Sequence, residues 1–152
     1  MTVIRPETGY SPVVFVRRLA VIAAVVLTAG TSGCVSTVGD PSGTAYRSMC
    51  VRSAHNAVDG LDMARRATID PPGPFRNSLM ERAHERITGA RKAVAQAVPP
   101  DPDAAQRRAK LQALLAQAER SYQALLNDGG PRSITAAQAV EDRLRDYITE
   151  NS

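Results

Sequence analysis

The chain has 152 residues with 19 basic and 15 acidic side chains, and only 4% of its residues are aromatic. This length is that of a single domain, and the lack of large aromatic side chains favours close helix packing over a large apolar pocket. Three of the basic residues and one of the acidic residues precede Cys34, so 16 basic and 14 acidic residues remain from there on. A balance this close to neutral gives no electrostatic case for nucleic-acid binding.

The N-terminal segment has the three parts of an export signal. Arg17 and Arg18 close a polar leader, the apolar segment LAVIAAVVLTAG follows at residues 19–30, and small residues then lead to Cys34. A membrane-spanning helix needs about 20 predominantly apolar residues. A shorter apolar segment therefore favours the hydrophobic region of a signal peptide.

The residues TSGC, at positions 31–34, resemble the lipobox of bacterial lipoproteins. In that family a diacylglyceryl group is attached to the cysteine, the peptide is cut just before it, and the new amino terminus can be acylated, for example with palmitate. Ser32 and Gly33 match the usual pattern, whereas Thr31 stands where an aliphatic residue is typical. The resemblance implies that residues 1–33 are a cleaved signal peptide and that lipid on Cys34 holds the protein at the extracytoplasmic face of the cell membrane. The alternatives are ordinary signal cleavage, which gives a secreted protein, and an uncleaved anchor.

Lipidation of Cys34 would leave Cys50 as the only free thiol, so that no internal disulfide could form. The helical position of Cys50 between Met49 and Val51 indicates a buried small hydrophobic side chain. A disulfide between Cys34 and Cys50 is the alternative without lipidation. The small and turn-prone residues that follow predict a flexible tether over residues 34–43, with a reach of about 30 Å when extended.

Proline- and glycine-rich turns divide residues 44–152 into four expected helices. The first covers residues 44–67 and the second residues 74–97. The third begins with Asp101 as N-cap and Pro102 in the first turn, and it ends at the segment NDGGP. A capping box from Thr135 to Gln138 is expected near the start of the fourth. Apolar residues at spacings of three and four form one stripe on each helix: Tyr46, Cys50, Ala54, Ala57, Leu61 and Ala64; Leu79, Ala83, Ile87, Ala90 and Val94; Ala104, Leu111, Leu115, Ala118, Tyr122 and Leu125; Ala137, Val140, Leu144 and Tyr147.

Four amphipathic helices with short connections predict an all-α fold, an antiparallel up-down four-helix bundle, after the signal peptide and tether. The alternative is a pair of helical hairpins that completes its core as a homodimer. In the bundle, the start of the first helix, the turn between the second and third, and the end of the fourth lie at the same end.

This end follows the predicted tether and should face the membrane. It brings together five basic residues that are candidates for contact with anionic lipid headgroups. The competing interpretation is that they only solvate helix faces, because four acidic residues lie nearby. The five candidates are Arg91, Lys92, Arg107, Arg108 and Lys110.

The segment ERAH at residues 81–84 has the Glu-x-x-His spacing with which di-iron bundle proteins supply two ligands from one helical turn. Such a site needs this unit twice, and the other histidine, His55, has Arg52 in place of the glutamate. A softer copper(I)-type site between the first two helices would use thioether, thiol and imidazole ligands. Its candidate ligands are Met49, Cys50, His55, Met63, Met80 and His84, although Met at helical spacing is also typical of a core.

The sequence contains none of the following common catalytic or binding motifs: a nucleophile elbow, an H-E-x-x-H unit, a phosphate-binding loop or a Cys-x-x-Cys pair. We therefore expect a non-catalytic protein without a cofactor. It would be anchored to the membrane and act through contact with another envelope protein, as an adaptor or accessory subunit. The alternative function is a small metal-binding lipoprotein that uses Met, His and Cys side chains of the first two helices.

Overall fold

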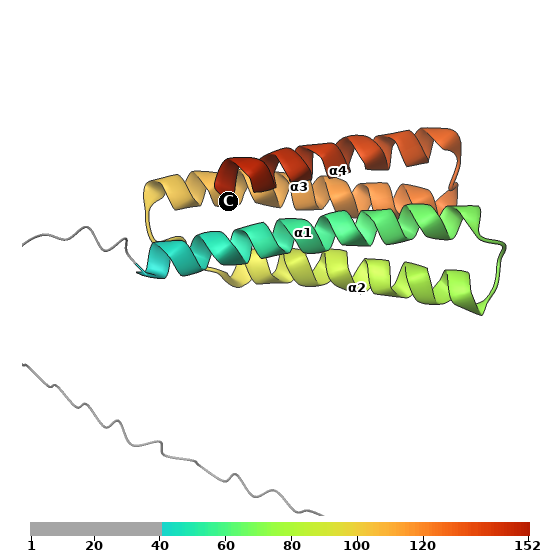
Figure 1. The fold of residues 1–152 in the computed structure, drawn as a ribbon, viewed down its shortest axis with the longest axis horizontal. Coiled ribbons are helices and arrows are strands. Elements are labelled where there is room, and N and C mark those ends of the chain that lie inside the picture. The colour runs from blue at the N-terminus through green and yellow to red at the C-terminus, as the bar shows by residue number, and fades with distance from the viewer. Residues whose placement is uncertain (1–40) are drawn as a thin grey trace, which may run out of the picture. The chain divides into compact units, whose positions relative to one another are not determined.

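The computed structural model describes residues 41–152, which form four helices and contain no strand (Figure 1). The helices are α1 (Pro41–Ile69), α2 (Pro74–Gln96), α3 (Pro102–Asn127) and α4 (Pro131–Asn151). None of these helices has an apolar stretch long enough to cross a membrane. The all-α prediction is confirmed for this part of the chain. The predicted signal peptide, the lipobox with Cys34 and the tether up to residue 40 lie outside the described residues.

Every one of the four helices begins at a proline. Proline suits the first turn because its missing N–H would have no partner there, and its fixed φ is already helical. α1 accordingly begins at Pro41 rather than at Thr44, so residues 41–43 are helical and the predicted tether boundary is wrong there. α3 begins as predicted, since the Asp101 carboxylate accepts a hydrogen bond from the backbone N–H of Ala104 at 2.6 Å.

The start of α4 differs from the prediction. Its N-cap is Gly130, and Thr135 lies inside the helix, where its hydroxyl donates to the carbonyl of Pro131 at 2.9 Å. The expected capping box at residues 135–138 is therefore wrong, because Pro131 already sets the first turn. The turn before it depends on Gly129, whose φ of 59° lies in the left-handed region that favours glycine.

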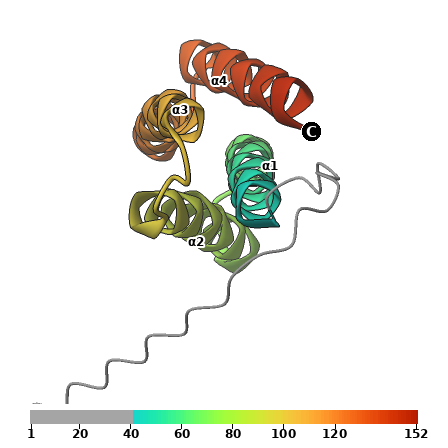
Figure 2. The same cartoon turned by 90° about the vertical axis from the view of Figure 1, so that its left-hand side faces the viewer.

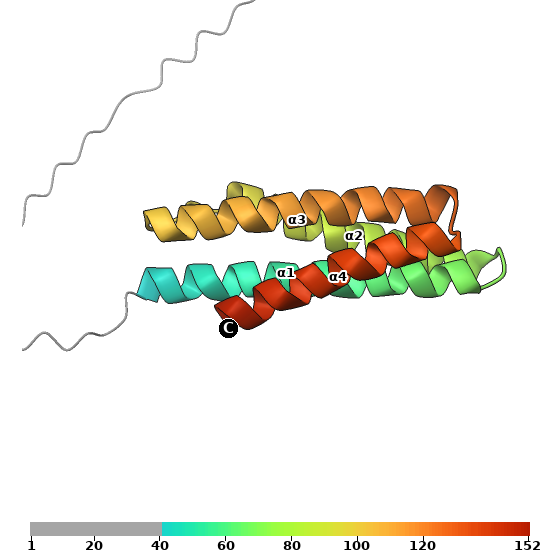
Figure 3. The same ribbon diagram turned by 90° about the horizontal axis from the view of Figure 1, so that it is seen from above.

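The helices run alternately up and down and form the predicted antiparallel bundle (Figures 1 and 2). α1 contacts all three other helices, including α3, whereas α2 and α4 do not contact each other. Figure 3 shows that α4 is inclined across α1. The end that holds residue 41, the α2–α3 turn and the last turn of α4 is called the proximal end here. The distal end holds the turns at residues 70–73 and 128–130.

The predicted apolar stripes form the core with a single exception. Leu79 is only partly buried, and Met80 takes the inward position with 5% of its surface exposed. Met80 continues the spacing of Ala83 and Ile87 by three residues, whereas Leu79 stands four residues before Ala83. The stripe of α2 is thus shifted by one position at its distal end.

α1 and α2 approach each other closely at Gly60. A Cβ atom at this position would lie 2.8 Å from the Ile87 side chain and 3.0 Å from the carbonyl oxygen of Ala83. Gly89, within α2, has open space around the same position. The two glycines therefore separate the effect of helix propensity from the effect of packing.

We expect Gly60→Ala to lower the free energy of unfolding by about 1 kcal/mol or more, because the overpacked contact outweighs the better helix propensity of alanine. Gly89→Ala should raise it by up to about 1 kcal/mol, because nothing opposes the same propensity gain. Urea denaturation followed by circular dichroism measures both changes. Equal stabilisation by the two substitutions would contradict the close contact at Gly60.

Candidate functional site

Four of the five basic residues predicted to contact the membrane already have partners within the protein. Arg108 donates to the carbonyl oxygens of Val94 at 3.1 Å and Ala95 at 2.7 Å, so it satisfies the last turn of α2. The other three form ion pairs, namely Arg91 with Glu119, Arg107 with Asp101 and Lys110 with Glu150. Lys92 is exposed and makes no hydrogen bond or ion pair with a described residue. Membrane contact by this set stays a prediction.

The structure does not bring the predicted metal ligands together. Gly60 lies against Ala83 and Ile87, so the antiparallel register of α1 and α2 is fixed. Cys50 lies ten residues toward the proximal end, about 15 Å along the helix axis, while Met80 lies on the distal side. His55 and His84 are both exposed, and the His84 ring packs on Tyr122 with 5.5 Å between ring centroids. Among the described residues, no group of three or more His, Cys, Asp or Glu could hold a metal ion.

Cys50 is buried, as expected, but its surroundings are more polar than the sequence indicated. The hydroxyls of Tyr46 and Tyr147 lie beside its thiol, and neither has a partner with hydrogen-bond geometry among the described residues. Burial, helped by the nearby thiol, raises the pKa of Tyr46 to about 12. Burial also raises the pKa of Tyr147 and that of the Cys50 thiol. All three groups are therefore held neutral at physiological pH.

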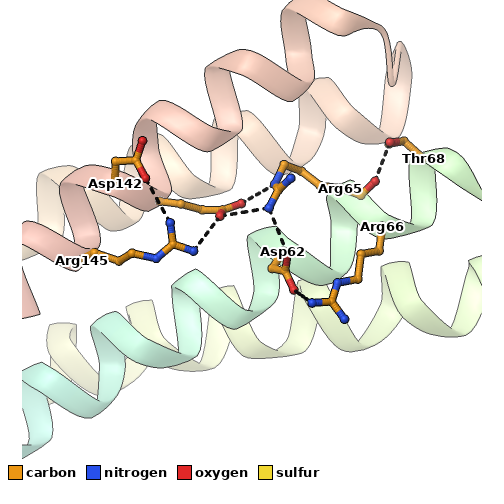
Figure 4. A network of polar contacts seen from close by, with 7 residues as sticks. Asp62, Arg65, Arg66, Thr68, Asp142 and Arg145 are labelled. Carbon is orange, nitrogen blue, oxygen red and sulfur yellow. Dashed lines mark hydrogen bonds and ion pairs between the residues drawn. The ribbon is translucent and has the colours of Figure 1, made fainter.

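A buried charge that the sequence analysis missed joins α1 to α4. Glu141 is 1% exposed, and its carboxylate accepts hydrogen bonds from Arg65 at 2.6 and 3.3 Å and from Arg145 at 3.2 Å. Arg65 also pairs with Asp62 at 3.0 Å, and Figure 4 shows the resulting network. The hydrogen bond to Glu141 is the main cause that raises the pKa of Arg65. Glu141 follows Ala137 by four residues and precedes Leu144 by three, so the apolar period itself marked an inward position.

The outer side of α3 and α4 carries a shallow groove of about 360 Å³, which is called the α3–α4 groove here. Alanines and Val140 form its apolar part, and a second hollow of about 470 Å³ adjoins it on α4 through shared Ala136 and Ala139. The groove is lined by Gln117, Arg120, Ser121, Ala124, Ala136, Ala139, Val140 and Arg143. The adjoining hollow adds Pro131, Arg132 and Thr135. The sequence analysis did not find this surface, because it needs two helices side by side.

Another hollow, of about 370 Å³, lies between the start of α3 and the end of α4. It is lined by two basic and two acidic side chains together with Gln106, Tyr147 and Asn151, and the pair Lys110–Glu150, at 2.5 Å, belongs to it. Its charges thus balance one another. The lining of the α3–α4 groove, in contrast, includes arginines and no acidic side chain.

Exposed large apolar side chains concentrate at the distal end. Ile69 is 82% exposed, Phe75 68% and Leu126 46%, and all three lie in the last or first turn of a helix that borders a distal turn. The two distal turns adjoin, because Gly129 lies against the side chain of Thr68. Val98, which is 84% exposed, is alone among the described large apolar residues in being this exposed at the proximal end.

Comparisons with protein-family models, with curated proteins and with solved structures find no match for this chain.

Removing one partner of the buried pair of Arg65 and Glu141 should cost far more stability than breaking a surface pair, because it leaves the other charge buried. Arg65→Met would leave Glu141 buried with Arg145 as its remaining charged partner, and we expect the free energy of unfolding to fall by about 3 kcal/mol. Arg86→Met, which removes an exposed pair with Asp59, should cost less than about 1 kcal/mol. The double variant Arg65→Met/Glu141→Met should recover much of the loss. Equal effects of the two single variants in urea denaturation would contradict this account.

The unpartnered hydroxyl of Tyr147 makes a further prediction about stability. We expect Tyr147→Phe to raise the free energy of unfolding by about 1 kcal/mol, because it removes a buried polar group without a hydrogen bond. The matched control is Tyr122→Phe, which removes the bond from its hydroxyl to the carbonyl oxygen of Met80 at 3.1 Å. This control should lower stability by about 1 kcal/mol. Thermal unfolding at neutral pH compares the two variants.

The buried tyrosines Tyr46 and Tyr147 should also determine how the stability of the fold changes at alkaline pH. The folded protein holds the phenolic protons of Tyr46 and Tyr147 more tightly than the unfolded chain, whose tyrosines titrate at 10.0. Titration of these tyrosines therefore leaves the free energy of unfolding unchanged below pH 10. It lowers the free energy of unfolding as the pH rises from 10 toward about 12, because the unfolded chain then loses its phenolic protons first. Replacing both by Phe should reduce the loss of stability in this interval. An unchanged pH profile in the double variant would show that other groups cause it.

Proposed function

We propose that this chain is a non-catalytic, lipid-anchored protein of the cell envelope that acts through protein–protein contacts, as an adaptor or accessory subunit. The anchoring rests on the resemblance of residues 31–34 to a lipobox. The role in protein contact rests on the exposed apolar side chains of the distal end. This second observation carries the proposal.

Ile69, Phe75 and Leu126 would each be more stable out of water. Complete burial of such a side chain is worth about 1.5–3 kcal/mol relative to full exposure. Single exposed apolar residues are common on protein surfaces, but several at one end of a small bundle are typical of a contact surface. All three lie in helix ends that border the distal turns, so one partner protein could cover them together.

The positions of the two ends support the same function. α1 begins at the proximal end, and the chain from Cys34 to Pro41 can extend at most about 25 Å. Lipid on Cys34 would therefore keep the proximal end near the membrane and leave the distal end for a partner. One acyl chain binds a membrane only marginally, whereas two anchor a protein stably, which a diacylglyceryl group supplies.

The test is cross-linking in cells, with mass spectrometry of the protein and of its cross-linked partners. We expect a lipid-sized mass increment on Cys34 that is absent in Cys34→Ala. We also expect a partner that is lost in Ile69→Ser/Phe75→Ser, because the variant removes the two most exposed of the three large apolar side chains at the distal end. Val98→Ser is the matched control, since Val98 is equally exposed but lies at the proximal end.

The proposal fails if the wild type cross-links to no other protein. The distal location fails if the partner is retained in Ile69→Ser/Phe75→Ser and lost in Val98→Ser. An unmodified chain recovered from the medium would remove the lipid anchor from the proposal.

A further inference from the structure

The α3–α4 groove and its adjoining hollow are lined by three arginines that form no ion pair with a described residue. Arg120 and Arg132 make no hydrogen bond or ion pair with any described residue. Arg143 donates only its Nε, to the carbonyl oxygen of Ala139 at 3.0 Å, which leaves both terminal nitrogens of its guanidinium available. Arg107, Arg108 and Arg145, on the same two helices, all have partners. The available positive charge of α3 and α4 is therefore concentrated along this groove.

The apolar part of the groove is narrow and made of small side chains. Ala124 on α3 faces Ala136 and Ala139 on α4, beside Val140. Small residues let the backbone of another helix approach closely, because the distance between packed helices depends on the side chains at the contact. No residue of α1 or α2 lines the groove, so neither of these helices fills it.

A polar side chain without a partner also lies in the groove. Ser121 is only 8% exposed as a residue, it lines the groove, and its hydroxyl has no hydrogen-bond partner among the described residues. The hydroxyl oxygen is not among the fully buried atoms without a partner, so it remains accessible. Ser121 therefore offers a donor and an acceptor to a molecule that enters the groove between the arginines.

We propose that the α3–α4 groove binds an amphipathic helix of a partner protein that has glutamate or aspartate on both flanks of a narrow apolar stripe. The stripe lies on the alanines, the carboxylates pair with Arg120, Arg132 and Arg143, and a polar group next to the stripe bonds to Ser121. The inference rests on the proposed function and names the chemistry of its partner. Pro131 places the adjoining hollow at the distal end, so the groove continues toward the exposed apolar side chains there.

Charge and position favour this occupant over a lipid surface or a second copy of the chain. Apart from Arg143, which lies just past the middle of α4, the lining residues of the groove belong to the distal half of α3 and α4, away from the end where α1 begins. A symmetric dimer through the groove would bring the same unpaired arginines of two copies together, which is repulsive. An acidic helix neutralises all three.

Two labelled peptides of about 20 residues, long enough to form helix, serve as probes. One has Glu on both flanks of a Leu/Ala stripe, and the other has Lys in place of each Glu. Fluorescence anisotropy with the full chain in mild detergent should show binding of the Glu peptide alone, weakening with salt. Arg120→Glu/Arg143→Glu should weaken it by about tenfold or more. Ala136→Leu should weaken it similarly by filling the groove. Arg82→Glu, at an exposed and unpaired arginine of α2, should leave it unchanged.

Equal binding of the two peptides, or equal weakening by the groove variants and Arg82→Glu, would overturn the inference. Displacement of the Glu peptide by phosphatidylglycerol but not phosphatidylcholine in the micelles would assign the groove to lipid headgroups and also overturn it. A dimer in sedimentation that dissociates in Arg120→Glu/Arg143→Glu would assign it to a second copy. In cells, a partner that cross-links to the wild type and persists in both groove variants would leave the proposed function intact while the groove inference fails.

Discussion

The small side chains of α1 are the constraint on which the rest of the bundle depends. Ala54, Ala57, Gly60, Ala64 and Ala67 are buried, and at Gly60 the contact with α2 leaves no room for a Cβ atom. α1 can therefore contact all three other helices, including α3, while α2 and α4 do not contact each other. Because α4 packs only on α1 and α3, its outer side has no neighbouring helix. Ala136 and Ala139 of the α3–α4 groove are exposed for this reason.

A buried ion pair then fixes the position of α4, which packs only on α1 and α3. The buried Glu141 of α4 meets Arg65 of α1, and a buried charge of this kind tolerates little displacement because it must keep its partner. The other arginines divide by what they contact. Arg108 completes the end of α2, whereas Arg120 and Arg132 contact no acidic group in the described part of the chain. Charge that stabilises the fold is thus spatially separate from charge that is available to a partner.

The two ends of the bundle differ in how far their charged groups are paired and in how much apolar surface they expose. At the proximal end, basic residues are largely paired, and the polar groups of Tyr46 and Tyr147 are closed off around Cys50. At the distal end, Ile69 and Phe75 remain exposed, and the α3–α4 groove approaches this end along α4. A protein held by its N-terminal side would present these surfaces away from its attachment. The proposed function and the proposed partner helix both depend on this difference between the proximal and distal ends.

The amino-acid sequence by itself determined the helices and their inward faces. Prolines at 74 and 102 and the period of three and four act over a few residues, so local patterns were sufficient there, although the start of α4 at Pro131 was placed wrongly. The short turns then favoured antiparallel neighbours. The same period included position 141, but a glutamate was not expected inside, because its partner Arg65 is 76 residues away in sequence. Only the tertiary structure decided which arginines have counter-ions, how far apart Cys50 and Met80 lie, and where two helices leave a groove. These properties depend on helix register and side-by-side placement, which no local pattern encodes.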